Sequence, residues 1–137
     1  MSVVPLSVEK TSVVIADDNL FMCEMISNYL QSQSDIELAG IAHDGLEAVE
    51  KIKRHRPDAV LLDCAMPKLD GLEVLEILSQ DSAKPPICIM VSGIGDDAVT
   101  KKATELGAKC CLIKPFELDL LVNRIRMFAP GKNVPEK

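Results

Sequence analysis

Three carboxylates, a hydroxyl and an amine each come directly after a short apolar run of this chain. They are Asp17 and Asp18, Asp63, Ser92 and Lys114. An aspartate is a competent nucleophile for phosphoryl transfer and forms an aspartyl phosphate. Neighbouring acids with oxygen ligands suit Mg²⁺, which keeps several waters and shares its coordination with phosphate oxygens. The lysine and the metal ion would then neutralise the phosphoryl charge, while the serine would hydrogen-bond one of its oxygens.

The charge of this group of residues itself calls for a cation. Two carboxylates about 4 Å apart repel each other by roughly 4 kcal/mol at an effective dielectric constant of 20. Three carboxylates therefore cannot stay ionised together without a counter-charge. Lys114 supplies one positive charge, and a bound Mg²⁺ (or Mn²⁺) would supply two more.

The elements that must position these residues alternate between two kinds of hydrophobic pattern. Short apolar runs typical of buried strands are separated by apolar residues at helical spacing. Strict alternation predicts a parallel sheet with right-handed crossovers and helices on both faces, and it places all the strand ends at one edge, where ligands bind. The predicted strands cover residues 13–16, 36–42, 59–62, 87–91 and 110–113, with the second at an edge of the sheet, and five helices lie between and after them.

The helical segments carry their own start and stop signals. Asp44 has the position of an N-cap in a capping box, and the helix after it must stop near Arg56 because Pro57 follows. We expect Met25 to lie on the inner face of the first helix and Leu46 on the inner face of the second. Asp70 and Gly71 form a turn and helix cap, and the fourth helix spans about 96–106.

Length and composition describe an ordinary globular domain. The chain has 137 residues, 47% hydrophobic, with a formal net charge of -6, which disfavours a grip on DNA or on an anionic membrane. Its five cysteines form no Cys-x-x-Cys pair, so we expect buried thiols in a reducing cytoplasm rather than a zinc site or disulfides. Residues 1–11 read as a loose leader without signal-peptide features, and 130–137 as a linker-like tail. No apolar run has membrane-spanning length.

Over residues 12–129 the chain resembles the receiver domain of two-component response regulators. The resemblance depends on Asp17-Asp18, on Asp63 with Met66-Pro67 and Asp70-Gly71 after it, on Ser92, and on Lys114-Pro115-Phe116. It implies a flavodoxin-like (CheY-like), doubly wound α/β fold with a five-stranded parallel sheet of order 2-1-3-4-5 and five helices. Within the family the chain is most similar to the receiver of the sporulation phosphorelay regulator, through residues 15–19, 99–103 and 105–108.

The resemblance also implies a role for each matching residue. Asp63 corresponds to the phosphoacceptor, Asp18 to a direct metal ligand, and Asp17 to a ligand that acts largely through water. The backbone carbonyl of Ala65 corresponds to a further metal ligand, Ser92 to the switch hydroxyl, and Lys114 to the lysine that pairs with the phosphate. The peptide bond between Lys114 and Pro115 corresponds to one that is cis in the family.

The implied partners are those of a signalling domain. The phosphodonor would be a histidine kinase or a histidine phosphotransfer protein. A DNA-binding output domain for transcription regulation could follow beyond this chain, and the face formed by helix four, strand five and helix five is where a homodimer could form. We expect no membrane partner and no direct contact between this domain and nucleic acid.

One position departs notably from the usual pattern, and two others bear on the lifetime of a phosphoryl group. Cys111 stands where receivers usually carry the Tyr or Phe that turns inward on activation, so signal transmission must use other groups. The two positions that frame the approach of a hydrolytic water are Ala65 and Ile94, neither of which can hydrogen-bond water through its side chain. Slow self-dephosphorylation is therefore the expectation.

Two other functions remain to be weighed against a phosphoacceptor that is not a classical enzyme. The first is a phosphatase with an aspartyl nucleophile, but Cys64 and Ala65 follow Asp63 where haloacid-dehalogenase-like enzymes place a second acid. The second is a pseudo-receiver that only mediates interactions, against which the retention of all five polar residues weighs. His43 and His55 lack a kinase-like context, so we expect solvent-exposed side chains rather than phosphodonors.

Overall fold

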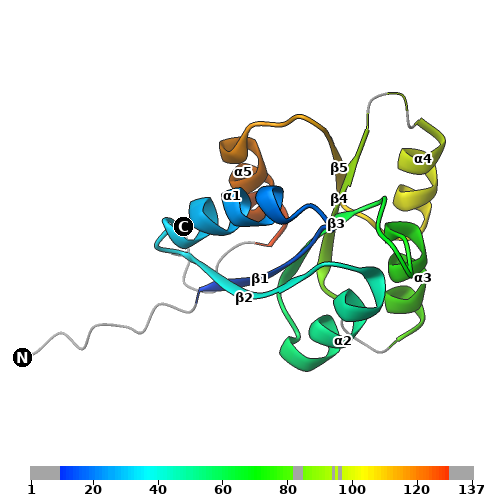
Figure 1. Ribbon diagram of the computed structural model, residues 1–137, viewed down its shortest axis with the longest axis horizontal. Coiled ribbons are helices and arrows are strands. Elements are labelled where there is room, and N and C mark those ends of the chain that lie inside the picture. Colours follow the sequence, from blue (N-terminus) through cyan, green and yellow to red (C-terminus); the bar gives the residue numbers. More distant parts are fainter. Residues whose placement is uncertain (1–9, 82–84, 94, 96, 130–137) are drawn as a thin grey trace, which may run out of the picture.

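The short apolar runs form five parallel strands in the computed structural model, which describes residues 10–81, 85–93, 95 and 97–129 (Figure 1). Their order in the sheet is β2-β1-β3-β4-β5, so the predicted topology and the edge position of the second strand are confirmed. The sheet contains β1 (Thr11–Ala16), β2 (Ile36–Ala42), β3 (Ala59–Asp63), β4 (Ile87–Ser92) and β5 (Cys110–Ile113).

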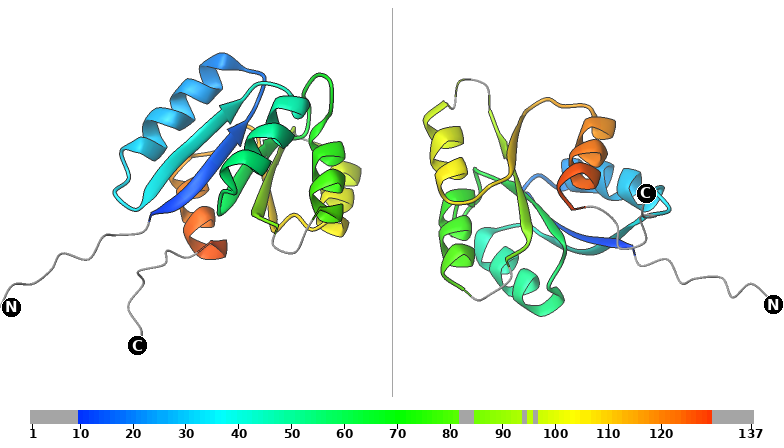
Figure 2. Two further views of the ribbon diagram at one scale, coloured as in Figure 1. Left: turned by 90° about the horizontal axis from the view of Figure 1, so that it is seen from below. Right: turned by 180° about the vertical axis from the view of Figure 1, so that it is seen from behind.

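Five helices cover the two faces of this sheet. One face lies against α1 and α5, and the other against α2, α3 and α4, as the views in Figure 1 and Figure 2 both show. The described residues are thus arranged in three layers, as alternating strands and helices require. The helices are α1 (Leu20–Gln31), α2 (Gly45–His55), α3 (Gly71–Gln80), α4 (Asp97–Glu105) and α5 (Leu118–Phe128). None of them is long and apolar enough to cross a membrane.

The strands are buried on both sides because successive side chains enter opposite halves of the core. Val13 and Ile15 pack toward α1 and α5, whereas Val14 and Ala16 pack toward α2, α3 and α4. Each large aliphatic side chain that is fully buried contributes roughly 1.5–3 kcal/mol of transfer free energy. The strands are anchored in the core in this way, and the polar residues Asp17, Asp63, Ser92 and Lys114 lie at or directly after their carboxyl ends.

The ends of the described chain lie side by side. β1 begins at Thr11, the last residue of the expected leader, where its N–H donates to the Asp35 carbonyl at 2.9 Å. The Thr11 hydroxyl reaches the carbonyl of Ala129 at 3.4 Å, just after α5. Residues 1–9 and 130–137 lie outside the described residues, so the leader and the tail remain predictions, as does Asp96 at the start of the fourth helix.

Two of the expected inward side chains point outward instead. Met25 is 38% exposed and Leu46 is 55% exposed. The inner face of α1 is formed by Cys23, Ile26 and Leu30, and each step along a helix turns a side chain by about 100°. In α2, Gly45 lies on the inner face and packs so closely against Leu69 that a Cβ on it would overlap that residue. This contact turns the neighbouring Leu46 to solvent.

Polar caps fix the starts of the first three helices. The side chains of Asn19, Asp44 and Asp70 each accept a hydrogen bond from a backbone N–H in the first turn. A complete capping box forms at Asp70 with Glu73. At Asp44 the reciprocal bond is different, because the Glu47 carboxylate accepts from the N–H of His43 at 2.7 Å rather than from that of Asp44.

Candidate functional site

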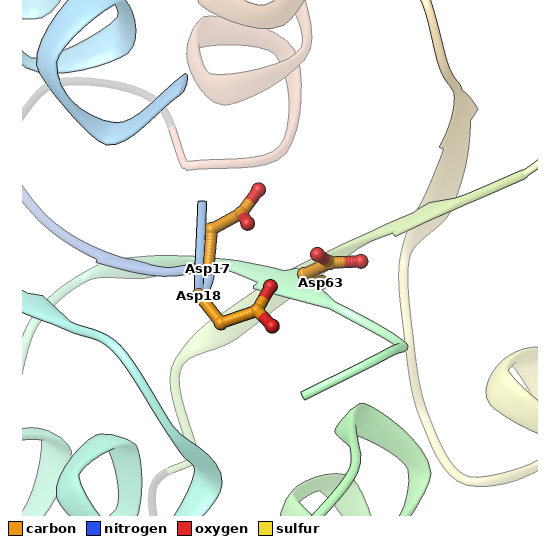
Figure 3. A group of neighbouring side chains, drawn as sticks. All are labelled: Asp17, Asp18 and Asp63. Carbon is orange, nitrogen blue, oxygen red and sulfur yellow. The ribbon is translucent and has the colours of Figure 1, made fainter. Parts of the chain in front are cut away.

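The three aspartates predicted to form the site meet at the carboxyl edge of the sheet (Figure 3). β1 and β3 are adjacent and parallel, and Ala16 pairs with Leu62 in their register. The residues that follow this pair are Asp17 and Asp63, which are consequently brought together from distant parts of the sequence. One carboxylate oxygen from each of Asp17, Asp18 and Asp63 lies within 4.8 Å of the others.

Lys114 enters the same cluster from the end of β5. Its Nζ lies 3.1 Å from Oδ2 of Asp63 and 3.4 Å from Oδ2 of Asp17. The backbone N–H of Lys114 donates to the Ser92 carbonyl at 2.9 Å, which continues the pairing of β4 with β5. The peptide bond between Lys114 and Pro115 is cis, as the resemblance to receiver domains implied.

Burial shapes the electrostatics of this cluster. Asp63 is only 5% exposed, so burial raises the pKa of its carboxyl group, and the charge of Asp17 raises it further. The N–H of Ala65, 3.2 Å from Oδ1, and the ammonium group of Lys114 oppose this rise without cancelling it. Burial by itself would lower the pKa of Lys114, but Asp63 and Asp17 outweigh it and raise that pKa.

The donors present fit a hard divalent cation. Among the described residues, this is the one group of three or more His, Cys, Asp or Glu side chains close enough to share a metal ion. The group offers carboxylate oxygens alone, and within the described part of the chain Lys114 is the one cationic side chain that forms salt bridges with it. An oxygen-only set with uncompensated negative charge favours Mg²⁺ or Mn²⁺ over zinc.

Ser92 completes the predicted set at the end of β4. The side chain is 2% exposed, and within the described part of the chain its Oγ has no hydrogen-bond partner. A buried polar atom without a partner costs about 1–3 kcal/mol, so such atoms are rare in native structures and a catalytic role or a bound ligand is among their explanations. The hydroxyl is therefore available to a ligand oxygen that enters this edge of the sheet.

The loop between Asp63 and α3 is held by close backbone contacts. The N–H of Gly71 donates to the Cys64 carbonyl at 2.9 Å, and the N–H of Gly45 donates to the Pro67 carbonyl at 3.2 Å. A Cβ on Gly71 would lie 2.6 Å from the carbonyl oxygen of Asp63, so that position requires glycine. Ala65 is exposed in this loop, and the role of its carbonyl as a metal ligand stays a prediction.

Two residues that the sequence did not assign to the site also reach it. The Cys23 thiol donates to the backbone carbonyl of Asp17 at 3.2 Å, and Nδ1 of His43 lies 3.3 Å from the same oxygen. Burial, with the charges of Asp17 and Asp18, raises the pKa of Cys23 to about 11, so its thiol keeps its proton. His43 directly follows the end of β2, so the strand-end rule that selected the acids could have found it.

The remaining predictions about single residues have mixed outcomes. His43 and His55 are both exposed, as expected, although His43 also contacts Asp17. All five cysteines are free. Cys111 packs on the side of α2, α3 and α4, and a hydrogen bond with Thr100 partly offsets the rise that burial causes in its pKa. Ile94, one of the two positions expected to frame a hydrolytic water, lies outside the described residues.

Comparison with known proteins places this arrangement in a family. The pattern of the response regulator receiver domain matches residues 13–126, most of the chain. The chain belongs to the response regulator receiver family. This receiver domain is similar to the response regulator domain of Thermotoga maritima CheB, with 32% identity over 93% of this chain and 100% of that one and a TM-score of 0.81.

Two further solved structures show the same likeness. The signal receiver domain of the putative response regulator NarL from Mycobacterium tuberculosis is 31% identical over 90% of this chain and 99% of that one, with a TM-score of 0.84. The CheX–CheY complex of Borrelia burgdorferi, with BeF3 and magnesium, matches at 32% identity over 87% and 89%, with a TM-score of 0.78.

Membership in the family defines the general function. Receiver domains are phosphoacceptors in two-component signalling rather than classical enzymes, and phosphorylation on aspartate is typical of them. They interact with histidine kinases or phosphotransfer proteins, and they bind Mg²⁺ at an acidic pocket. This receiver domain has a cluster of aspartates of that kind.

Proposed function

We propose that Asp63 is the phosphoacceptor of this receiver domain and that Mg²⁺ is held by Asp17, Asp18, Asp63 and the backbone carbonyl of Ala65. The observation that carries the proposal is the position of Lys114, whose ammonium group bridges Asp63 and Asp17 beside Asp18. One lysine among three carboxylates leaves negative charge that a divalent cation would balance. The magnesium present with the Borrelia CheY supports the same choice of cation.

Each residue has a distinct part in the transfer. An oxygen of Asp63 forms a bond to phosphorus while the bond from phosphorus to the donor nitrogen breaks, so that the histidine leaves. Lys114 lies against Asp63 and neutralises charge on the phosphoryl oxygens. Ser92 donates its unpartnered hydroxyl to one of them. The bound cation would supply further charge neutralisation.

Intact mass spectrometry after incubation with Mg²⁺ and acetyl phosphate tests the proposal. We expect the addition of one phosphoryl group to the wild-type protein and none to Asp63→Asn, because the amide lacks the nucleophilic carboxylate. Consumption of donor far beyond one equivalent would favour the aspartyl phosphatase. The absence of any addition to the wild type would favour the pseudo-receiver.

The phosphodonor protein would contact the rim of the same edge. The first turn of α1 follows Asp18 and Asn19 directly and presents exposed apolar side chains, with Leu20 67% and Phe21 71% exposed. Two large apolar side chains exposed next to each other at the rim of the site suit contact with a protein that must bring its histidine to Asp63. We therefore assign this turn of α1 to the binding of the histidine kinase or phosphotransfer protein.

The finer assignments also belong to the proposal. The similarity of residues 15–19, 99–103 and 105–108 to the sporulation phosphorelay receiver supports a role in a relay in the cytoplasm. A DNA-binding output domain after this chain is supported by the likeness to a DNA-binding response regulator of the LuxR family from Staphylococcus aureus, 25% identical with a TM-score of 0.81. Faster phosphotransfer from a sporulation phosphotransfer protein than from an unrelated one would test the relay assignment.

A further inference from the structure

The backbone carbonyl of Asp17 lies at the point where β1 ends and the acidic pair begins. The N–H of Asp17 still donates to the Ala42 carbonyl of β2 at 3.0 Å, as the ladder requires. The carbonyl oxygen is approached instead by two side chains, the Cys23 thiol at 3.2 Å and Nδ1 of His43 at 3.3 Å. Sγ and Nδ1 are themselves 3.9 Å apart, so both reach one oxygen from adjacent directions.

This oxygen belongs to the peptide that joins Asp17 to Asp18. Because a peptide unit is planar, fixing its oxygen fixes the direction in which the Cα of Asp18 leaves the strand. The Asp17 side chain is fixed separately, since its Oδ1 accepts from the N–H of Asn19 at 2.9 Å. Asp18 is exposed and makes no ion pair of its own among the described residues, so its position depends on the backbone.

The two donors come from different elements and connect the site to its neighbours. Cys23 lies in the first turns of α1 and is 2% exposed. His43 precedes the cap of α2, and the next residue, Asp44, forms an ion pair with Lys68 at 3.5 Å. Lys68 belongs to the loop that follows Asp63. The carbonyl of Asp17 is thereby connected, through His43 and the N-cap residue of α2, to the loop that contains Ala65, the other proposed ligand.

We propose that Cys23 and His43 are positioning residues, which clamp the Asp17 carbonyl and so hold the carboxylate of Asp18 beside those of Asp17 and Asp63 in the arrangement that receives Mg²⁺. This inference rests on the proposed function for the identity of the cation. A carbonyl oxygen can only accept, so the clamp requires a proton on Nδ1 of His43. Groups that orient metal ligands in this way commonly contribute 10–100-fold to metal affinity.

The affinity for Mg²⁺, measured by calorimetry on the whole chain, is the first test. We expect Cys23→Ala and His43→Ala each to weaken binding by about 10-fold. Cys23→Ser and His43→Asn keep a donor at nearly the same place and should recover most of the affinity. His43 is exposed, so its variants should fold even if a change at Cys23 disturbs the core.

Matched controls separate the clamp from general packing. Cys88 is a similarly buried thiol that donates to the Pro86 carbonyl at 3.8 Å, just before the start of β4. His55 is an exposed histidine at the far end of α2. Cys88→Ala and His55→Ala should keep wild-type affinity for Mg²⁺. If Cys88→Ala lost as much affinity as Cys23→Ala, or if the clamp variants bound like the wild type, the clamp would be refuted.

A second measurement needs no metal. Nitrogen-15 NMR of the metal-free protein should show neutral His43 with its proton on Nδ1, whereas free neutral histidine favours Nε2, and His55 serves as the internal reference. A neutral His43 that carries its proton on Nε2 would overturn the clamp. A wild-type protein that bound no Mg²⁺ would instead refute the proposed function, and the tautomer of His43 would still decide the clamp.

Discussion

At the level of single residues, Asp63 combines a functional requirement with a cost in stability. Its carboxylate is buried beside Asp17, and both effects raise its pKa. A carboxyl group with a raised pKa in the folded state keeps its proton up to a higher pH there than in the unfolded chain. Folding stability therefore falls as pH rises from the unfolded pKa of this group through its folded pKa. At neutral pH the ionised group opposes folding.

We accordingly expect Asp63→Asn to stabilise the metal-free protein at pH 7 by about 1 kcal/mol, because the amide carries no charge. Chemical unfolding in the presence of EDTA would measure the difference between the variant and the wild type. The difference should shrink as the pH falls and Asp63 takes up its proton, and Mg²⁺ should reduce it by stabilising only the wild type. Equal stability at every pH would contradict this account.

The lifetime of the phosphoryl group is a second property that we expect single side chains to set. Ala65 is exposed in the loop after Asp63 and has no side-chain group that could orient a water molecule. We expect slow release of phosphate by the wild type and a release roughly 10-fold faster in Ala65→Asn, because positioning the nucleophile is a large part of this catalysis. Ile94→Glu tests the second framing position. Unchanged release in both variants would show that the lifetime is set elsewhere.

At the level of elements, the starts of α2 and α3 hold the loop that follows Asp63. α2 approaches that loop so closely at Gly45 that a Cβ there would overlap the carbonyl and side chain of Leu69. The Leu69 atoms concerned are the backbone carbonyl and Cβ, neither of which a change of side-chain rotamer can move away. The same approach allows the N–H of Gly45 to reach the Pro67 carbonyl at 3.2 Å.

Gly45→Ala should therefore lower the free energy of unfolding by roughly 2–3 kcal/mol, as overpacking at a rigid contact does. Gly40→Ala is the matched control, because a Cβ on Gly40 would meet no atom closer than the His55 ring at 3.5 Å. Denaturant unfolding of both variants would show whether the cost is specific to the loop contact. A Gly45→Ala variant as stable as Gly40→Ala would mean that α2 can shift away without loss.

At the level of the whole molecule, the exposed apolar side chains around the site determine which surface a partner protein can contact. If Asp63 is the phosphoacceptor as proposed, we expect a donor as small as acetyl phosphate to reach it without contacting α1, whereas a phosphodonor protein would have to contact the rim of the site. The exposed Phe21 should contribute to the second reaction alone. Exposed apolar side chains also occur on β5, at Ile113, and on α5, at Met127.

Phe21→Ser should slow phosphotransfer from the cognate histidine protein by roughly 10-fold, as the loss of an aromatic contact residue does. Phosphorylation by acetyl phosphate and the thermal stability should stay at wild-type values, because Phe21 is 71% exposed. Leu46→Ser is the control, since Leu46 is 55% exposed on α2. If both variants accepted the phosphoryl group equally fast, the assignment of α1 to the donor would fail.

The sequence by itself was enough to predict the fold and which main residues would meet at one edge of the sheet. Five apolar runs alternating with helical patterns imply a parallel sheet, and a parallel sheet brings Asp17, Asp63 and Lys114 to one edge. What it could not decide was the rotation of each helix about its axis. Met25 and Leu46 were expected inside, but the packing of Cys23 and Gly45 against neighbouring elements turns them outward.

Only the tertiary structure could show that Cys23 and His43 meet at the Asp17 carbonyl. Their meeting depends on the register between β1 and β2 and on the rotation of α1, neither of which is encoded in local spacing. The burial of Asp63, and with it the rise in its pKa, likewise depends on residues distant in sequence. Hydrophobic periodicity is a local signal and predicts elements, whereas hydrogen bonds and desolvation at the site depend on how those elements pack.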